Sequence, residues 1–583
     1  MSRGLGDVYK RQTMNQFREK KHFDARRAFL FLCMGLAAVT LVWRAVCLQV
    51  LDKDFLQSQA DARHLRVVSL PAHRGKILDR NGEPLAISTP VESVWANPQV
   101  LGGEMQRIPE LTRLLSLDAA RVQQLVASRA DREFVYLRRH LSPELAGQVK
   151  ALKIPGVHLQ REYRRYYPGG EVTAHVTGFT NIDDIGQEGI ELAYEEWLGG
   201  EPGAKRVVKD GNHNIIEDVE SIRRPRPGKD LVLSIDRRIQ YLAYRALKST
   251  MKEHKARAAT AVLLDVKSGE VIAMVNQPSF NSNNRQQLRS SNMRNRAVTD
   301  VFEPGSTMKP FIAASALQSG RYRADTPVAT SPGWMRVGVN TVRDVHDYGE
   351  LDVTGVIRKS SNVGISKIAL ALPAEEIWET LSELGFGAQT FSGFPGEASG
   401  LLSYHGGWNA IETATLSFGY GVSVTSLQLA QAYAVLATGG IKRSVTFLRD
   451  AEVTEERRVM PATVTRQVID MLEEAVGPNG TAPQARVPGY RVAGKTGTVK
   501  KSTAGGYSSN EYLAVFAGMA PASDPRFVMV VMVDDPTNGK YYGGQVAAPV
   551  FSSVMAGALR LMAVPPDDVP LLQTRVVAGE EPA

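Results

Sequence analysis

The chain has 583 residues, of which 43% are hydrophobic and 22% charged, a globular composition for two or three domains. Its net charge of +8 is not arranged as a basic run interleaved with aromatic residues, which excludes a nucleic-acid groove of the usual kind. The only cysteines, Cys33 and Cys47, lie together near the N-terminus, so the rest of the chain has no disulfide and no cysteine-based metal site.

The first predicted element is an apolar segment behind a basic flank. Residues 1–13 show no periodicity, and we expect Met14 to be the native start, which N-terminal sequencing would test. Residues 28–51 are apolar except for Arg44, whose long side chain can reach the membrane interface. We predict an uncleaved transmembrane anchor over 28–51, with residues 1–27 in the cytoplasm. A cleaved signal peptide is the alternative, but no small-residue cleavage site adjoins the apolar core.

Residues 52–226 have the length of one domain. Asn81-Gly82 predicts a hairpin turn, with Arg74, Asp79 and Arg80 beside it for charge pairing. Two further motifs combine turn glycines with charges suited to pairing across a domain junction; they are Arg164–Gly170 and Gly186–Glu191. The carboxylate pair Glu188 and Glu191 would suit glycoside chemistry, but no other catalytic residue accompanies it. Residues 133–160 look like a small α/β module, and 223–228 like a linker.

Residues 227–565 predict helices on both sides of an antiparallel sheet, with a helical subdomain inserted. In chain order we expect a strand at 231–235, a helix at 237–255, a hairpin of strands 260–265 and 270–276, and an all-helical stretch over 306–437. Strands at 490–500, 512–519 and 527–534 and a helix at 548–562 follow. The fold class is thus multidomain α/β (α+β), and residues 566–583 are expected to be a disordered tail.

Ser306-Thr307-Met308-Lys309 is the first candidate for chemistry. Pro304-Gly305 marks a tight turn, and residues 309–318 read as an apolar helix. A serine in the first turn of a helix has backbone N–H groups and the positive end of the helix dipole beside its oxygen. A lysine three residues on lies on the same face, so a nucleophile and a base are brought together, as covalent catalysis requires.

This tetrad alone is a weak signal, because Ser249-Thr250-Met251-Lys252 repeats it inside an amphipathic helix with no turn before it. Serine acyl enzymes add an S-x-N and a K-T-G motif. S-S-N occurs at 290, 360 and 508, and K-[ST]-G at 267 and 495, but Lys267-Ser268-Gly269 reads as a hairpin turn. One ordered set fits: Ser306/Lys309, Ser360/Asn362 and Lys495/Thr496/Gly497/Thr498.

This ordered set resembles the penicillin-binding protein and serine β-lactamase superfamily. The motifs at 74–86, 164–170 and 186–191 resemble those of the N-terminal pedestal of class B penicillin-binding proteins. Segments at 302–305, 487–490, 541–544 and 547–551 are similar to the septal members of that class. The resemblance covers nearly the whole chain after Met14. It implies a pedestal, or dimerisation-type, domain at 52–226 and a transpeptidase domain at 227–565.

The resemblance also implies a role for each motif residue. Ser306 is the expected nucleophile and Lys309 its base, with a pKa lowered by burial and by the second cation, Lys495. Ser360 is expected to relay a proton to the leaving amine, and Asn362 to hold the substrate amide and the Lys309 amine. Thr496 and Thr498 are expected to bind a substrate carboxylate, and Gly497 to let the strand approach the substrate. The N–H groups of Ser306 and Thr498 form the expected oxyanion hole.

The implied reaction is D,D-transpeptidation between peptidoglycan stem peptides, at the division septum, with β-lactams acylating Ser306. We expect no metal and no cofactor, and the histidines, such as His73, His175, His346 and His405, show no metal spacing. Expected partners are stem peptides, lipid-linked wall precursors, the inner membrane and a division-complex glycosyltransferase, with the catalytic domain in the periplasm. The alternatives are an elongation transpeptidase, a β-lactamase-like hydrolase and a β-lactam sensor.

Overall fold

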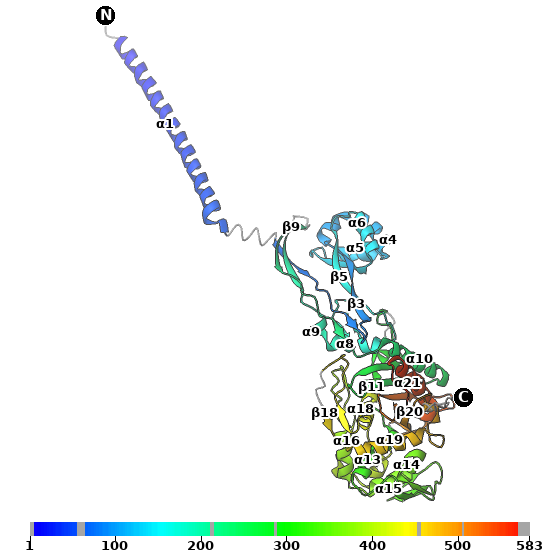
Figure 1. The fold of residues 1–583 in the computed structure, drawn as a ribbon. Helices are drawn as coiled ribbons and strands as arrows, with labels where there is room; N and C mark the ends of the chain where they lie inside the picture. Colours follow the sequence, from blue (N-terminus) through cyan, green and yellow to red (C-terminus); the bar gives the residue numbers. More distant parts are fainter. Residues whose placement is uncertain are drawn as a thin grey trace, which may run out of the picture.

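A computed structural model describes residues 5–54, 65–209, 215–284, 289–451, 456–503 and 506–568. Helix α1 (Leu5–Val46) projects away from the rest of the chain, which forms an elongated body with a β-rich part nearer α1 and a larger mixed part at the far end (Figure 1). Mixed α/β architecture with one N-terminal apolar helix is confirmed. Most of the predicted tail lies outside the described residues, which reach Asp568.

The apolar part of α1 and the turn after it (Cys47–Leu51) has the length of a membrane span. Arg26–Leu51 has a mean hydropathy of 2.0, and none of its most apolar window is buried against the protein. Arg44 lies inside this stretch without breaking the helix. Among the described helices, this is the one long and apolar enough to cross a bilayer.

Two larger sheets, with the small β6–β7 pair beside them, build the pedestal (residues 65–226). A three-stranded antiparallel sheet has the order β1-β8-β9, formed by β1 (Leu65–Leu70), β8 (Gly203–Lys209) and β9 (Ile215–Arg223). In the second sheet the long β3 pairs with β2, β4 and β5; the strands are β2 (Ile77–Leu78), β3 (Pro84–Ala96), β4 (Val135–Leu141) and β5 (Val157–Tyr166). The predicted hairpin at Asn81-Gly82 is confirmed, with Gly82 at a φ of +84° in the turn between β2 and β3.

Helices cover one part of this second sheet because the C-terminal half of β3 is apolar on that side. Val94 and Ala96 of β3 are buried against three helices, α4 (Ile108–Leu115), α5 (Ala119–Ser128) and α6 (Pro143–Ala151). The remaining pedestal elements are short: α3 (Pro98–Leu101), α7 (Ala174–Thr177), β6 (Phe179–Thr180), β7 (Gly186–Glu188), α8 (Gly189–Ala193) and α9 (Glu195–Leu198). The predicted α/β module around 133–160 is therefore part of this helix-covered end.

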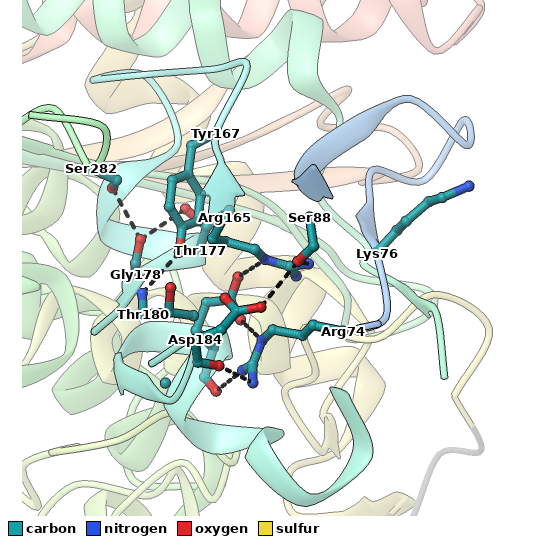
Figure 2. A network of polar contacts seen from close by, with 12 residues as sticks. Arg74, Lys76, Ser88, Arg165, Tyr167, Thr177, Gly178, Thr180, Asp184 and Ser282 are labelled. Atoms are coloured by element: carbon teal, nitrogen blue, oxygen red, sulfur yellow. Dashed lines mark hydrogen bonds and ion pairs between the residues drawn. The ribbon is translucent and has the colours of Figure 1, made fainter. Parts of the chain in front are cut away.

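The three pedestal motifs meet in a buried ionic cluster. Glu191 accepts hydrogen bonds from Arg74 Nε at 2.7 Å and from Arg165 Nε at 2.6 Å. All three side chains are at most 1% exposed. Figure 2 shows Arg74 and Arg165 converging from opposite sides, with Ser88 and Asp184 beside them; Arg165 Nη1 donates to Ser88 Oγ at 3.1 Å. The motifs thus form one structural unit within the pedestal.

Two of the places where the pedestal contacts the rest of the chain lie at the β2–β3 turn and at Tyr167. At the β2–β3 turn, Arg80 pairs with Glu270, and Asn81 Nδ2 donates to Asp236 Oδ2 at 3.2 Å. At the second, Asn283 donates from Nδ2 to Tyr167 O at 2.9 Å and accepts from Tyr167 N at 3.0 Å. Ser282 Oγ donates to Gly178 O nearby (Figure 2). These bonds connect segments more than 100 residues apart in sequence.

The predicted strand 231–235 is wrong in its length and in its sheet. Strand β10 spans only Leu231–Val232 and pairs in parallel with β2 of the pedestal. Leu233 instead bridges to Leu448. A local pattern of apolar residues predicts an extended chain but not the strand it pairs with, which is why this element was assigned to the catalytic sheet.

The catalytic sheet is five-stranded and antiparallel, in the order β12-β11-β21-β20-β19. Its strands are β11 (Ala258–Asp265), β12 (Val271–Gln277), β19 (Ala493–Thr503), β20 (Gly506–Ala520) and β21 (Phe527–Asp534). Residues of β21 alternate between two cores: Val528 and Val530 face the helical subdomain, while Met529 and Val531 face the other side, where α10 (Arg237–His254) and α21 (Ala548–Leu561) lie. The hairpin predicted at Lys267-Ser268-Gly269 is confirmed.

The helical subdomain fills the other face of the sheet. Its helices are α13 (Lys309–Gln318), α14 (Val353–Lys359), α15 (Asn362–Leu370), α16 (Ala374–Glu383), α17 (Ala410–Leu416), α18 (Ser426–Ala437) and α19 (Ala462–Val476). Helix α18 contacts β11 and β21 directly. Shorter elements complete the domain: α11 (Ser290–Met293), α12 (Arg296–Thr299), β17 (Ile441–Arg443), β18 (Glu456–Arg458) and α20 (Gly543–Val546).

The prediction of an all-helical stretch over 306–437 is wrong between α13 and α14. Four short strands lie there: β13 (Pro327–Ala329), β14 (Trp334–Val337), β15 (Asn340–Arg343) and β16 (Glu350–Asp352). Strands β14 and β15 form a hairpin with a two-residue loop, and Gly338, the first residue of that loop, has a φ of +59°. A glycine at the first position of such a turn favours a hairpin, and this was the overlooked signal.

Candidate active site

The candidate motif residues converge on one cleft between β19 and the helical subdomain. The cleft has a volume of about 620 Å³. Ser306, Ser360, Asn362, Thr496 and Thr498 all line it. Strand β19 is the edge of its sheet, so its outward N–H and C=O groups are available to an extended peptide.

The nucleophile candidate lies on a tight turn that runs straight into a helix. Gly305–Met308 form a 3₁₀ turn, and α13 begins at Lys309, as the sequence predicted. Gly305 has a φ of +57°, and a Cβ there would lie 2.4 Å from Val499 Cγ2. Thr307 Oγ1 donates to Pro304 O at 2.7 Å, and the buried Tyr433 hydroxyl donates to Thr307 O at 3.0 Å. The turn is therefore held from within and from α18.

Lys309, three residues after Ser306 in the sequence, is completely buried. Its Nζ donates to Ser360 O at 2.6 Å, to Asn362 Oδ1 at 2.8 Å and to Ser360 Oγ at 3.2 Å. Burial lowers the pKa of Lys309 well below its usual value, and the nearby Lys495 lowers it further, while Asp344 acts in the opposite direction. Burial and the neighbouring cation thus favour a neutral amine at this position.

Ser360 lies between the two lysines. It follows the last residue of α14 in the left-handed conformation, with a φ of +61°, before α15 begins at Asn362. Lys495 Nζ donates to Ser360 Oγ at 2.8 Å. Burial lowers the pKa of Lys495 to about 7. Ser360 Oγ therefore contacts both amines and connects them across the base of the cleft.

Asp344 supports this arrangement and was missed by the sequence analysis. Its carboxylate accepts hydrogen bonds from Ser361 Oγ, from Asn362 N and from Val363 N, the last at 3.0 Å. It caps the N-terminus of α15 and so fixes the backbone that carries Ser360 and Asn362. Asn362 Nδ2 also donates to the neighbouring Arg343 O at 3.1 Å. Because Asp344 precedes the helix by 18 residues, no local capping pattern identifies it.

The two threonines of β19 also take part in bonds within the protein. Thr496 Oγ1 donates to Thr481 Oγ1 at 3.0 Å, and Thr498 Oγ1 accepts from Gly543 N at 3.0 Å. Their hydroxyls line the cleft, so Thr496 keeps acceptor capacity and Thr498 keeps its O–H donor. Thr481 was not among the predicted site residues.

Gly497 lies against the nucleophile turn, and its expected role beside the substrate stays a prediction. A Cβ on Gly497 would lie 2.8 Å from Pro304 O and 3.2 Å from Thr307 Cγ2. Successive residues of a strand point to opposite sides, so Gly497 faces the nucleophile turn and not the side of Thr496 and Thr498. The glycine lets β19 lie directly against the turn that carries Ser306.

Tyrosines form one wall of the cleft. The rings of Tyr512 and Tyr541 stack at 4.3 Å between centroids, and those of Tyr541 and Tyr542 lie 4.5 Å apart. Tyr420 and the exposed His346 also line the cleft. These residues come from four separate segments, and no sequence motif groups them.

The competing sequence matches lie elsewhere. Ser249 and Lys252 are exposed on α10, and Ser290-Ser291-Asn292 lies in the short α11. Ser508-Ser509-Asn510 lies within β20. Within the described ranges, no group of three or more His, Cys, Asp or Glu side chains is arranged to hold a metal ion.

Comparisons with known proteins match both parts of the chain. Residues 259–556 match the penicillin binding protein transpeptidase domain, and residues 69–233 match the penicillin-binding protein dimerisation domain. The chain is 44% identical over 564 residues to peptidoglycan D,D-transpeptidase FtsI of Escherichia coli K12, which covers 95% of each protein. It is 43% identical over 534 residues to the probable peptidoglycan D,D-transpeptidase PbpC of Pseudomonas aeruginosa, covering 92% of this chain and 94% of that protein.

Solved structures of a penicillin-binding protein and of a peptidoglycan synthetase are also similar to this chain. The transpeptidase domain of Burkholderia pseudomallei penicillin-binding protein 3 is 44% identical, with a TM-score of 0.54, and covers 58% of this chain and 98% of that one. A peptidoglycan synthetase from Bifidobacterium adolescentis is 25% identical, with a TM-score of 0.69 over 87% of this chain and 98% of that one. The second match extends the similarity well beyond the catalytic part.

Proposed function

The chain belongs to the class B penicillin-binding proteins, and from this premise we propose that it is a peptidoglycan D,D-transpeptidase in which Ser306 is the nucleophile. The observation that carries the assignment is the buried Lys309 amine, which Ser360 and Asn362 hold, together with Ser306, the only S-x-x-K serine that lines the described cleft.

Acylation begins with proton transfer from Ser306 to Lys309. A neutral amine has two N–H groups, and the oxygens Ser360 O and Asn362 Oδ1 accept them at 2.6 and 2.8 Å. The nitrogen lone pair is then free to take the Ser306 proton as Oγ attacks the carbonyl carbon of the penultimate D-Ala. The Ser306 and Thr498 N–H groups stabilise the resulting oxyanion, an interaction whose loss typically costs about 10²–10³ in rate.

Collapse of the tetrahedral intermediate breaks the peptide bond. The proton passes from Lys309 through Ser360 Oγ to the terminal D-Ala nitrogen, which leaves as an amine. Ser360 is suited to this step because its Oγ contacts Lys309 and Lys495 at 3.2 and 2.8 Å. The terminal carboxylate accepts a hydrogen bond from the free O–H of Thr498; the Thr496 hydroxyl, which donates to Thr481, joins it only after rotating away from that partner. An amine of a second stem peptide then attacks the acyl-enzyme, and Ser306 Oγ leaves with the returned proton.

The cellular setting follows from the anchor. We propose that Arg26–Leu51 spans the inner membrane once, with the basic N-terminal flank in the cytoplasm and the catalytic domain in the periplasm. The similarity to FtsI favours a role at the division septum, with a glycosyltransferase partner that makes the glycan strands. Depletion of the protein should then give filamentous cells, whereas round cells would indicate an elongation role.

Labelling with a fluorescent penicillin tests the site. Membranes carrying the wild-type chain and the Ser249→Ala variant should label equally, because Ser249 lies exposed on α10. The Ser306→Ala variant should not label at all. Normal labelling of Ser306→Ala would refute the assignment of the nucleophile.

A further inference from the structure

Glu303, three residues before the nucleophile candidate, joins three distant segments of the chain. Its Oε1 accepts a hydrogen bond from Gly421 N at 2.9 Å and one from the Tyr507 hydroxyl at 3.0 Å. Gly421 is 118 residues away in the sequence and Tyr507 is 204 residues away. One carboxylate therefore connects the nucleophile segment, the loop before α18 and the β19–β20 hairpin. We call these residues, with Tyr420, the rim clasp.

The rim clasp lies at the mouth of the cleft. Tyr420 lines the cleft, and its ring meets the Tyr507 ring edge-on at 5.1 Å. The loop rests directly on the nucleophile turn: Gly305 N donates to Gly419 O at 3.2 Å, and a Cβ on Gly419 would lie 2.2 Å from Gly305 O. Burial raises the pKa of Tyr420 and of Tyr507, and the charge of Glu303 raises both further, so the Tyr507 hydroxyl stays a donor.

Stability alone does not account for a carboxylate at this position. Only Oε1 of Glu303 is used, while Oε2 is buried without a hydrogen-bond partner in the described part of the chain. A buried polar atom left unpaired costs free energy, and such atoms in native proteins call for an explanation. The two bonds from Oε1 organise the rim of the cleft, which gives the side chain a role beyond the fold.

The substrate path leads past the rim clasp. In the proposed reaction the terminal carboxylate lies at Thr496 and Thr498, so the upstream part of the donor peptide continues along β19 towards Lys500. Lys500 and Tyr420 line this end of the cleft. Tyr507 lies just beyond, where it pairs across the hairpin with Ser502. A donor stem longer than its last two residues must therefore pass between β19 and the clasp.

We propose that Glu303 is a positioning residue for donor recognition: by tying the Tyr420 loop and the Tyr507 hairpin to the nucleophile turn, it sets the width of the cleft where the upstream donor stem binds. This inference rests on the proposed function. Glu303 has no contact with Lys309, Ser360 or Lys495 among the hydrogen bonds and ion pairs of the described residues. A loosened rim would weaken the binding of substrate and transition state alike, which raises KM and leaves kcat unchanged.

The test uses the full-length chain in detergent and a thioester analogue of a stem peptide ending in D-Ala. For Glu303→Ala we expect KM to rise about tenfold with kcat within about twofold, because two bonds to a charged acceptor are lost. Glu303→Gln keeps an acceptor oxygen and should restore KM to within about threefold of the wild type. Tyr507→Phe removes one of the two donors, and its KM should lie between those of Glu303→Gln and Glu303→Ala.

The matched control is Glu171→Ala. Glu171 accepts from the Tyr244 hydroxyl and from Lys248 Nζ, an equivalent carboxylate–phenol contact on α10. It should leave KM unchanged.

Three results would overturn the inference: an unchanged KM for Glu303→Ala, a loss confined to kcat, or a Gln variant as impaired as Ala. Fluorescent penicillin separates this failure from failure of the proposed function. If Ser306→Ala abolishes labelling while Glu303→Ala keeps its KM, only the role of Glu303 is wrong. If Ser306→Ala still labels, the nucleophile assignment itself is wrong.

Discussion

Replacing Glu191 by glutamine should destabilise the pedestal strongly. The carboxylate lies between the Arg74 and Arg165 guanidinium groups, with contacts of 2.7 and 2.6 Å, and all three side chains are at most 1% exposed. Removing one partner of a buried ion pair leaves an uncompensated charge and costs about 3–5 kcal/mol. For a domain of this size each kcal/mol lowers Tm by about 2–4 °C, so we expect a fall of about 6–20 °C.

Scanning calorimetry of the full-length chain measures this fall in Tm, with the unfolding transition of the pedestal followed separately from that of the catalytic domain. Glu195→Gln is the matched control, because Glu195 pairs with the same Arg74 at 2.8 Å but is 32% exposed. A partly exposed pair contributes at most about 1 kcal/mol, so the control should lose no more than about 4 °C. Equal shifts for the two variants would refute the argument that burial of the charge makes Glu191 critical.

Three predictions concern the catalytic site. Burial lowers the pKa of Lys495 to about 7, so the rate of an acylation that needs its charge should fall as the pH rises through about 7. Arginine stays charged over this range, so the Lys495→Arg variant should not show this fall in a stopped-flow pH profile. Asp344→Ala removes the carboxylate that holds the backbone of Asn362 and should slow penicillin acylation at least about tenfold; an unchanged rate would show that the Ser361 cap of α15 is sufficient without it. Gly497→Ala places a Cβ 2.8 Å from Pro304 O and should slow acylation about a hundredfold with little loss of labelling at saturation; a wild-type rate would contradict the contact.

The parts of the site that depend on neighbouring residues could be predicted from the sequence. The turn at Pro304-Gly305 and the helix from Lys309 depend on neighbouring residues, and the structure has both where they were predicted. The hairpins at Asn81-Gly82 and Lys267–Gly269 are confirmed for the same reason. Turn and capping signals act over a few residues, so a single sequence is enough to detect them.

The parts of the fold and of the site that depend on contacts between distant residues could not be predicted from the sequence. Asp344 binds the first residues of α15 across 18 and 19 residues, and Glu303 contacts Tyr507 across 204. The pairing of β10 with β2 joins residues 154 apart, and the direction of Gly497 depends on which segment packs against β19. Such contacts are set by tertiary packing, which no periodicity or turn motif records.

Peptide mass mapping after reaction with benzylpenicillin tests the central claim most directly. The full-length chain is acylated, digested and searched for the peptide that carries the acyl group. A single stoichiometric adduct on Ser306, lost in the Lys309→Ala variant under the same exposure, is the predicted result. An adduct on any other residue, such as Ser249, or acylation at the wild-type rate without Lys309, would contradict the account of Ser306 as a nucleophile activated by a buried lysine.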